Sequence, residues 1–189
     1  QGTGQIAGGG LMLVQVVVFL ADAIVGFFSA LLLLRFFMQA MRVSFAGPVG
    51  HFVVTLTNWA VKPLRRVIPG LLGVDLASLT GAFLLQLALL LLIVAANNHL
   101  LNDGVGLLLL VLLGALKALL RLSVYIFMGA LILQAVLSWV NPYSPVAAPA
   151  NQLTRPLLDP IRRVLPPISG IDLSPLVAIL LAQVVLMLL

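Results

Sequence analysis

The chain alternates between long apolar stretches and short polar segments. Four stretches, residues 11–41, 76–96, 105–140 and 173–189, are almost entirely apolar. An α-helix rises about 1.5 Å per residue and needs about 20 apolar residues to cross the hydrocarbon core of a bilayer. The pattern therefore predicts an all-α membrane protein with four transmembrane helices.

The four stretches differ in length. Residues 173–189 are barely long enough for one crossing, which suggests that the natural chain continues past Leu189. Two stretches are longer than an upright crossing requires. We expect each of them to be one continuous helix, because only Gly114 in the second resembles a break. The first part of each long helix, about 11–21 and 105–117, is expected to lie along or beyond the outer interface.

The polar segments contain one sequence motif twice, which we call the arginine phrase. The sequence Pro-Leu-Arg-Arg-Val-Ile-Pro begins at Pro63, and Pro-Ile-Arg-Arg-Val-Leu-Pro begins at Pro160. Each is followed by Gly-Val-Asp-Leu or Gly-Ile-Asp-Leu. Every residue of the second copy lies 97 positions after its counterpart, and 9 of the 17 positions in 63–79 are identical. This self-similarity indicates two copies of one structural unit.

Each unit is predicted to contain a long span, a polar loop, a short amphipathic interfacial helix, the arginine phrase and a second span. Two crossings return the chain to the same side, so the units have parallel orientation, unlike the inverted repeats of many transporters. We place a flexible Gly-rich tail at 1–10, the first unit at 11–98, an outer loop at 99–104 and the second unit at 105–189.

Charge changes the picture by giving an orientation. Charged residues are only 8% of the chain, against about 25% in average soluble domains. The net charge is +5, and most Lys and Arg lie within or near the arginine phrases. The positive-inside rule then places both phrases in the cytoplasm and both termini outside. This asymmetry reports orientation, and no nucleic-acid partner is expected.

The candidate binding residues are the paired arginines and the basic residues near them. They either anchor the topology by reaching lipid phosphates, or they form a site for anionic lipids or a partner membrane protein. The second interpretation is physically reasonable because the guanidinium fork matches phosphate and carboxylate. The residues are Lys62, Arg65 and Arg66 in the first unit, and Arg155, Arg162 and Arg163 in the second.

The prolines and glycines of the phrase are expected to shape its backbone. A proline fits the first turn of a helix, where its missing N–H is harmless, and a later proline ends the helix. A glycine then permits the turn into the next span. These residues are Pro63, Pro69 and Gly73 in the first copy, and Pro160, Pro166 and Gly170 in the second.

Five charged residues next to or within the spans need partners. Asp75 and Asp172 each precede a span, and we favour capping of that span over an ion pair with the arginines of the same phrase. Asp22 and Arg121 occupy equivalent positions in the two units and predict an ion pair near the outer face. Arg35 is the deepest charge in a span. It either has a functional partner or reaches the cytoplasmic interface.

No catalytic set can be recognised. The sequence contains no nucleotide-binding loop and no paired carboxylates, and His51 and His99 have no metal-ligand neighbours. We therefore expect no enzyme activity, no cofactor and no metal site. The favoured hypothesis is an accessory or scaffold protein that binds partner membrane proteins, a second copy of itself or anionic lipids. The alternative is a small channel or transporter subunit active in osmotic ion homeostasis.

Three motifs together resemble one family. They are the doubled phrase, Leu-Leu-Leu-Arg-Phe-Phe-Met-Gln at 32–39 and Leu-Ser-Trp-Val at 137–140. They resemble the bacterial YggT (YlmG-type) family, and the resemblance covers the chain from about residue 11. It implies a multi-pass protein of the bacterial inner membrane, linked to osmotic or envelope stress and to assembly of membrane complexes. It implies no agreed catalytic residues.

Overall fold

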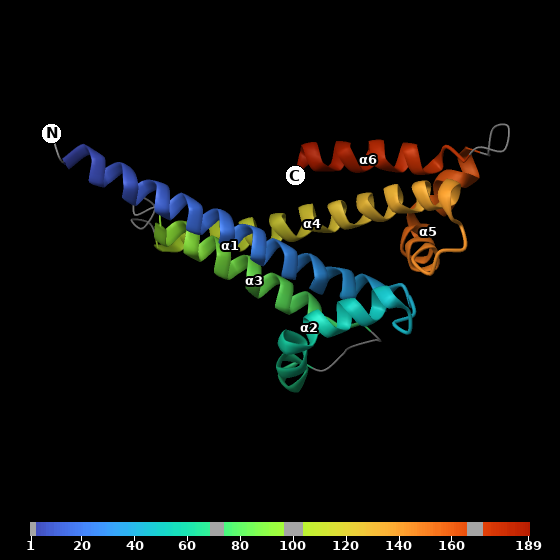
Figure 1. Cartoon of the computed structure of the whole chain (residues 1–189), viewed down its shortest axis with the longest axis horizontal. Helices are drawn as coiled ribbons and strands as arrows, with labels where there is room; N and C mark the ends of the chain where they lie inside the picture. The colour runs from blue at the N-terminus through green and yellow to red at the C-terminus, as the bar shows by residue number, and fades with distance from the viewer. Residues whose placement is uncertain (1–2, 69–73, 97–103, 166–171) are drawn as a thin grey trace.

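Six helices make up the regular structure of the described residues. The computed structural model describes residues 3–68, 74–96, 104–165 and 172–189. The chain is all-helical there, as the apolar pattern predicts (Figure 1). The helices are α1 (Thr3–Ala40), α2 (Pro48–Val67), α3 (Leu76–Ala96), α4 (Gly104–Val140), α5 (Ala147–Val164) and α6 (Ser174–Leu188).

Three of these helices are long and apolar enough to cross a membrane. They provide the segments Met12–Ala40 in α1, Leu76–Ala96 in α3 and Gly106–Val140 in α4. The fourth apolar helix, α6, has 15 residues, fewer than the about 20 that a full crossing requires. The described residues therefore contain three candidate spans, where the sequence predicted four.

The long helices extend further than one crossing. α4 continues through Gly114 without a break, as expected. α1 begins at Thr3, so most of the segment that we expected to be a flexible tail is helical. The physical reason is cooperativity: a glycine costs about 1 kcal/mol relative to alanine inside a helix, but extending an existing helix is much easier than starting one.

α1 ends in a hydrogen-bonded cap. The N–H of Val43 donates to the carbonyl of Met38 at 2.7 Å, and the N–H of Arg42 donates to the carbonyl of Gln39 at 3.1 Å. Arg42 has a φ of 55°, in the left-handed region. This is the Schellman arrangement, in which an apolar contact accompanies the two bonds. Val43 and Met38 are both buried in one cluster, so the cap turns the chain back toward α1.

The amphipathic segment and the arginine phrase form one helix in each half of the chain. Pro63, expected in a first turn, lies inside α2, and Pro160 lies inside α5 after Pro156. That expectation was wrong because the helix begins about four turns earlier, at Pro48 in α2. An internal proline removes one helical hydrogen bond and bends the helix. Figure 1 shows α2 changing direction along its length.

Both helices end in the same way. Ile68 after α2 has φ −117° and ψ 95°, and Leu165 after α5 has φ −116° and ψ 90°. Each is followed in the sequence by a proline, which disfavours the helical conformation of the residue before it. This supports the role expected for Pro69 and Pro166. Those two prolines, and Gly73 and Gly170, lie outside the described residues.

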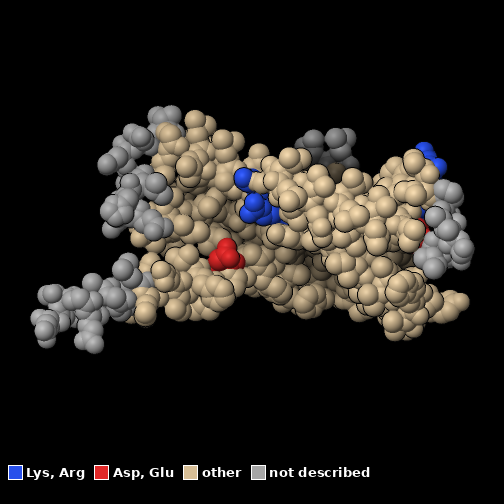
Figure 2. All heavy atoms as spheres, turned by 90° about the horizontal axis from the view of Figure 1, so that it is seen from above, with Lys and Arg blue, Asp and Glu red and all other residues tan. Residues whose placement is uncertain are grey.

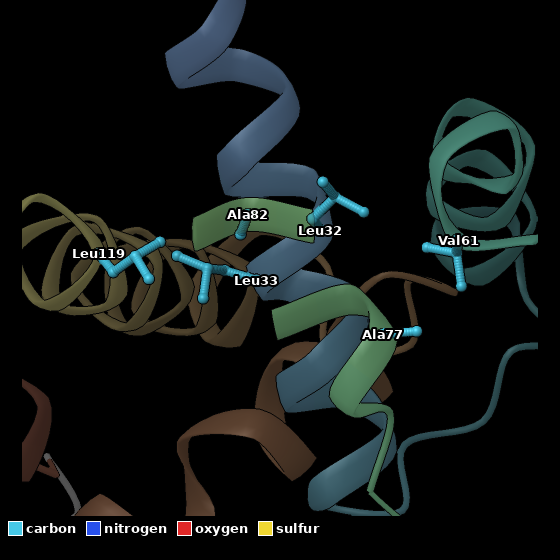
Figure 3. Packing of buried hydrophobic residues seen from close by; sticks show 6 residues of the cluster. All are labelled: Leu32, Leu33, Val61, Ala77, Ala82 and Leu119. Carbon is cyan, nitrogen blue, oxygen red and sulfur yellow. The ribbon is translucent and has the colours of Figure 1, made fainter. Parts of the chain in front are cut away.

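The core joins four of the helices. Its central cluster is Leu32 and Leu33 of α1, Val61 of α2, Ala77 and Ala82 of α3, and Leu119 of α4. Figure 3 shows these side chains around the crossing of α1 and α3. A Cβ atom at Gly81 would lie 3.1 Å from a methyl group of Leu64. The glycine therefore permits α2 to pack closely against α3.

The packing partners recur along the chain. α2 packs against α1 and α3, and α5 packs against α4 and α6. Both amphipathic helices lie toward the same end of the long helices (Figure 1).

The surface of the protein is largely uncharged, and Figure 2 shows few acidic or basic side chains on the face in view. Such a surface suits contact with lipid rather than with water.

Candidate functional site

Arg65 and Asp75 form an ion pair within the first arginine phrase. Arg65 lies in the last turn of α2, and Asp75 directly precedes α3. The Nη2 atom of Arg65 lies 2.6 Å from Oδ2 of Asp75, and its Nε atom donates to Oδ1 at 3.3 Å. Two parallel bonds of this kind fix the relative orientation of the two groups. The ion pair, which the sequence analysis favoured less than capping, therefore forms.

Arg35 reaches the same carboxylate from α1. Its side chain is buried, with 7% exposed, and its Nε atom lies 3.4 Å from Oδ2 of Asp75. Its Nη1 atom donates to Oγ1 of Thr57 at 2.8 Å and to Oδ1 of Asn58 at 3.1 Å. Arg35 therefore has a carboxylate partner and two amphipathic-helix partners. We call Arg35, Thr57, Asn58, Arg65, Asp75 and Ser78 the polar junction.

Asp75 is the centre of the polar junction. Its side chain is 1% exposed, and it accepts a hydrogen bond from Oγ of Ser78 at 2.8 Å. Burial raises the pKa of Asp75, but the bonds from Arg65 and Ser78 and the charges of Arg65 and Arg35 outweigh it and hold the pKa below its ordinary value. Asp75 is therefore ionised at neutral pH and ties α1, α2 and α3 together.

The second phrase has a more open ion pair. Arg162 donates to Oδ2 of Asp172 from Nε at 2.9 Å, and its Nη2 atom lies 2.7 Å from the same oxygen. The two side chains are 40% and 38% exposed. Asp172 also accepts the N–H of Ser174 at 2.9 Å, at the start of α6. Burial raises the pKa of Asp172, but the bonds from Ser174 and Arg162 outweigh it and lower the pKa.

Gln134 occupies the place in the second half that Arg35 occupies in the first. It lies 99 positions after Arg35, and Thr154 lies 97 positions after Thr57. The hydroxyl of Thr154 donates to Oε1 of Gln134, whereas the hydroxyl of Thr57 accepts from Arg35, so the same two positions are bonded with the opposite hydrogen-bond direction. Both halves thus join the long helix to the amphipathic helix at equivalent positions, but only the first half uses a charge. The offset of 99 that aligns Asp22 with Arg121 also aligns Arg35 with Gln134, but Gln134 was not among the site residues predicted from the sequence.

The second arginine of each phrase is exposed. Arg66 and Arg163 make no ion pair within the part of the chain that the structure describes, and the same holds for Lys62. Arg155 pairs with Asp159 across one helical turn, Nε to Oδ2 at 3.3 Å, in an exposed position. The paired arginines therefore divide into one that holds an aspartate and one that faces outward.

The ion pair predicted between Asp22 and Arg121 does not form. Both side chains are exposed, and no carboxylate–guanidinium contact joins them among the described residues. The physical reason is that this part of α1 packs against α3. Asp22 lines a shallow groove there with Ile93 and Ala96 of α3.

The chain matches the family model CCB3/YggT over residues 14–96 and 113–189. The chain belongs to the CCB3/YggT family. A relative in Pseudomonas aeruginosa, an uncharacterized protein, is 39% identical over 174 residues, which cover 90% of this chain and 86% of the relative. The uncharacterized protein YggT of Escherichia coli strain K12 is 35% identical over 168 residues, covering 88% and 85%. No solved structure matches the chain.

Family membership confirms the resemblance carried by the doubled phrase and agrees with the apolar helices of a membrane protein. The resemblance also includes the segment that holds Arg35. In this CCB3/YggT protein the two motifs meet in space, because Arg35 and the phrase residues Arg65 and Asp75 form one cluster. The geometry thus joins two parts of the sequence that the motifs alone left separate.

Proposed function

We propose that this protein is a non-catalytic accessory protein of the bacterial inner membrane. It binds anionic lipid head groups, or partner membrane proteins, through the exposed basic residues Lys62, Arg66 and Arg163. The observation that carries the proposal is the division within each phrase. The first arginine is bound to an aspartate, whereas the second is exposed and without an ion pair in the described residues.

The proposed architecture has four spans in two parallel units, with the arginine phrases in the cytoplasm. The two segments matched by the family model begin 99 residues apart, at 14 and 113, which supports a duplication. The short helix α6 would be the fourth span, since a bilayer can thin locally around a short apolar segment at modest cost. The orientation follows from the excess of Lys and Arg beside the phrases.

The physical case for anionic lipid rests on charge near the membrane surface. A Lys or Arg there contributes about 1 kcal/mol of attraction to an anionic leaflet. Arg65 and Arg162 are partly neutralised by their aspartates, so they contribute less. Arg66 and Arg163 have no aspartate partner in the described residues. Binding of this kind would support the roles in envelope stress or membrane-complex assembly that the family resemblance implies.

Replacing Arg66 and Arg163 together by Gln is expected to weaken binding of anionic lipid roughly 30-fold, since about 2 kcal/mol of attraction is lost. Native mass spectrometry of the protein released from nanodiscs that contain phosphatidylglycerol would measure the retained lipids. The matched control is the double variant Lys117→Gln and Arg121→Gln. It removes the same charge from exposed positions of α4, about 29–35 Å from the helix end at Val140.

The control variant is expected to retain as much lipid as the natural protein. Equal lipid loss in both double variants would show a general effect of net charge and would contradict the proposed function. Loss of a co-purifying membrane protein with unchanged lipid, in the Arg66 and Arg163 variant alone, would instead assign the exposed arginines to a protein partner.

A further inference from the structure

A cavity of about 390 Å³ lies between the end of α4 and α5. Its volume falls within the range of about 300–1,000 Å³ that is typical of small-ligand sites. We call it the α4–α5 cavity. Its polar wall is formed by Gln134 and Ser138 of α4, and by Asn151, Arg155 and Arg162 of α5.

Comparison with the first half of the chain explains why no long side chain fills this space. There the long side chain of Arg35 extends from α1 and bonds Thr57, Asn58 and Asp75. The second half exchanges the positions of the arginine and the amide. Gln134 stands at the place of Arg35, and Arg155 stands at the place of Asn58. Gln134 is shorter and bonds Thr154.

The chemistry of the cavity wall favours an anion. Two arginines of the wall are each paired with an aspartate. Asp159 contacts Nε of Arg155, and Asp172 contacts Nε and Nη2 of Arg162. Neither aspartate lines the cavity. The two Nη atoms of Arg155 remain available for another partner, next to the amide and hydroxyl donors of the cavity wall. A phosphate, with several acceptor oxygens, matches such a set of donors.

The surroundings of the cavity favour a lipid as the source of that phosphate. Leu137, Pro142 and Ala147 form its apolar part, next to the last turn of an apolar helix. Trp139 and Tyr143, 84% and 95% exposed, lie beside it in the sequence. Exposed Trp and Tyr at the end of a span mark the membrane–water interface, where lipid phosphates lie.

We propose that the α4–α5 cavity binds the phosphate group of one anionic phospholipid. The inference rests on the proposed function, in which exposed basic residues of the protein contact anionic lipid. It adds a defined site that holds one lipid molecule. Arg155 is the main ligand, and Gln134, Ser138 and Asn151 supply neutral donors.

Arg155→Gln is expected to weaken binding of the single retained phosphatidylglycerol roughly tenfold, because a hydrogen bond to a charged group is lost. The probe is phosphatidylglycerol, titrated into nanodiscs that hold the full chain and otherwise contain phosphatidylcholine, with native mass spectrometry as the readout. The matched control is Asp159→Asn, which removes the same ion pair but keeps Arg155. It is expected to bind the lipid at least as well as the natural protein.

Equal loss of the lipid in Arg155→Gln and Asp159→Asn would overturn the inference, because the effect would then come from the broken ion pair. Inorganic phosphate that displaces the lipid at equal concentration would assign the cavity to a soluble anion and would also overturn it. The double variant of Arg66 and Arg163 is expected to lose the other retained anionic lipids but to keep this one. The proposed function and the cavity can therefore fail separately.

Discussion

Replacing Asp75 by Asn is expected to destabilise the protein by about 3–5 kcal/mol, because Arg35 would keep its charge in a buried site without a carboxylate. Arg35 is 7% exposed and has Asp75 as its ion-pair partner. Asn has the shape of Asp but cannot neutralise the guanidinium. The free energy of unfolding, measured by SDS titration in mixed micelles at neutral pH, would give the magnitude.

The matched control is Asp172→Asn in the second phrase. Its partner Arg162 is 40% exposed and remains hydrated when the carboxylate is lost, so the expected cost is below about 1 kcal/mol. Asn also keeps an oxygen for the N–H of Ser174. Equal losses in the free energy of unfolding for the two substitutions would show that burial of Arg35 does not determine the cost of removing the carboxylate.

The pH dependence follows from the direction of the pKa shift. The pKa of Asp75 is lowered in the folded protein, so its stabilising contribution is fully present above the unfolded-state value of about 3.9. The contribution is lost as the pH falls through the lower folded-state pKa. A measurement at neutral pH therefore reports the whole effect of the substitution.

Adding Arg35→Gln to Asp75→Asn is expected to restore about 2 kcal/mol, because the double variant leaves no uncompensated buried charge. The second half of the chain already has Gln at the place of Arg35, where Gln134 is bonded to Thr154. The engineered Gln would face Thr57 in the same way. SDS titration of both variants measures the coupling.

The control for this rescue is Arg65→Gln in the Asp75→Asn background. The side chain of Arg65 is 47% exposed, so water solvates it without the aspartate. Its removal is therefore expected to restore little stability. Equal rescue by both second substitutions would contradict the assignment of the cost to Arg35.

The apolar pattern was sufficient to predict the helices but not their ends. Runs of apolar residues predicted α1, α3 and α4, since helices in lipid need a continuous apolar surface. Pro63 was placed wrongly because proline favours a first turn only on average, and packing of Val53, Thr57 and Val61 sustains α2 through it. Tertiary packing thus overrode the local preference.

The candidate site could be predicted only in part. The arginine phrase is local, and its ion pair spans ten positions in the sequence, so the sequence offered it as an alternative. The contact of Arg35 with Asp75 depends on how α1 packs against α3, which spacing does not give. The ion pair predicted between Asp22 and Arg121 was wrong for a related reason. At Asp22, α1 packs against α3, where Asp22 lines a groove with Ile93 and Ala96.

The central claim is that adjacent arginines of one phrase have different tasks. The most direct test compares Arg65→Gln with Arg66→Gln, which remove the same charge from neighbouring positions. Both the free energy of unfolding and the affinity for phosphatidylglycerol would be measured. We predict that Arg65→Gln costs about 1 kcal/mol of stability and leaves lipid affinity nearly unchanged. Arg66→Gln should leave stability unchanged and weaken lipid binding roughly fivefold. Equal effects of the two substitutions on both quantities would contradict the account.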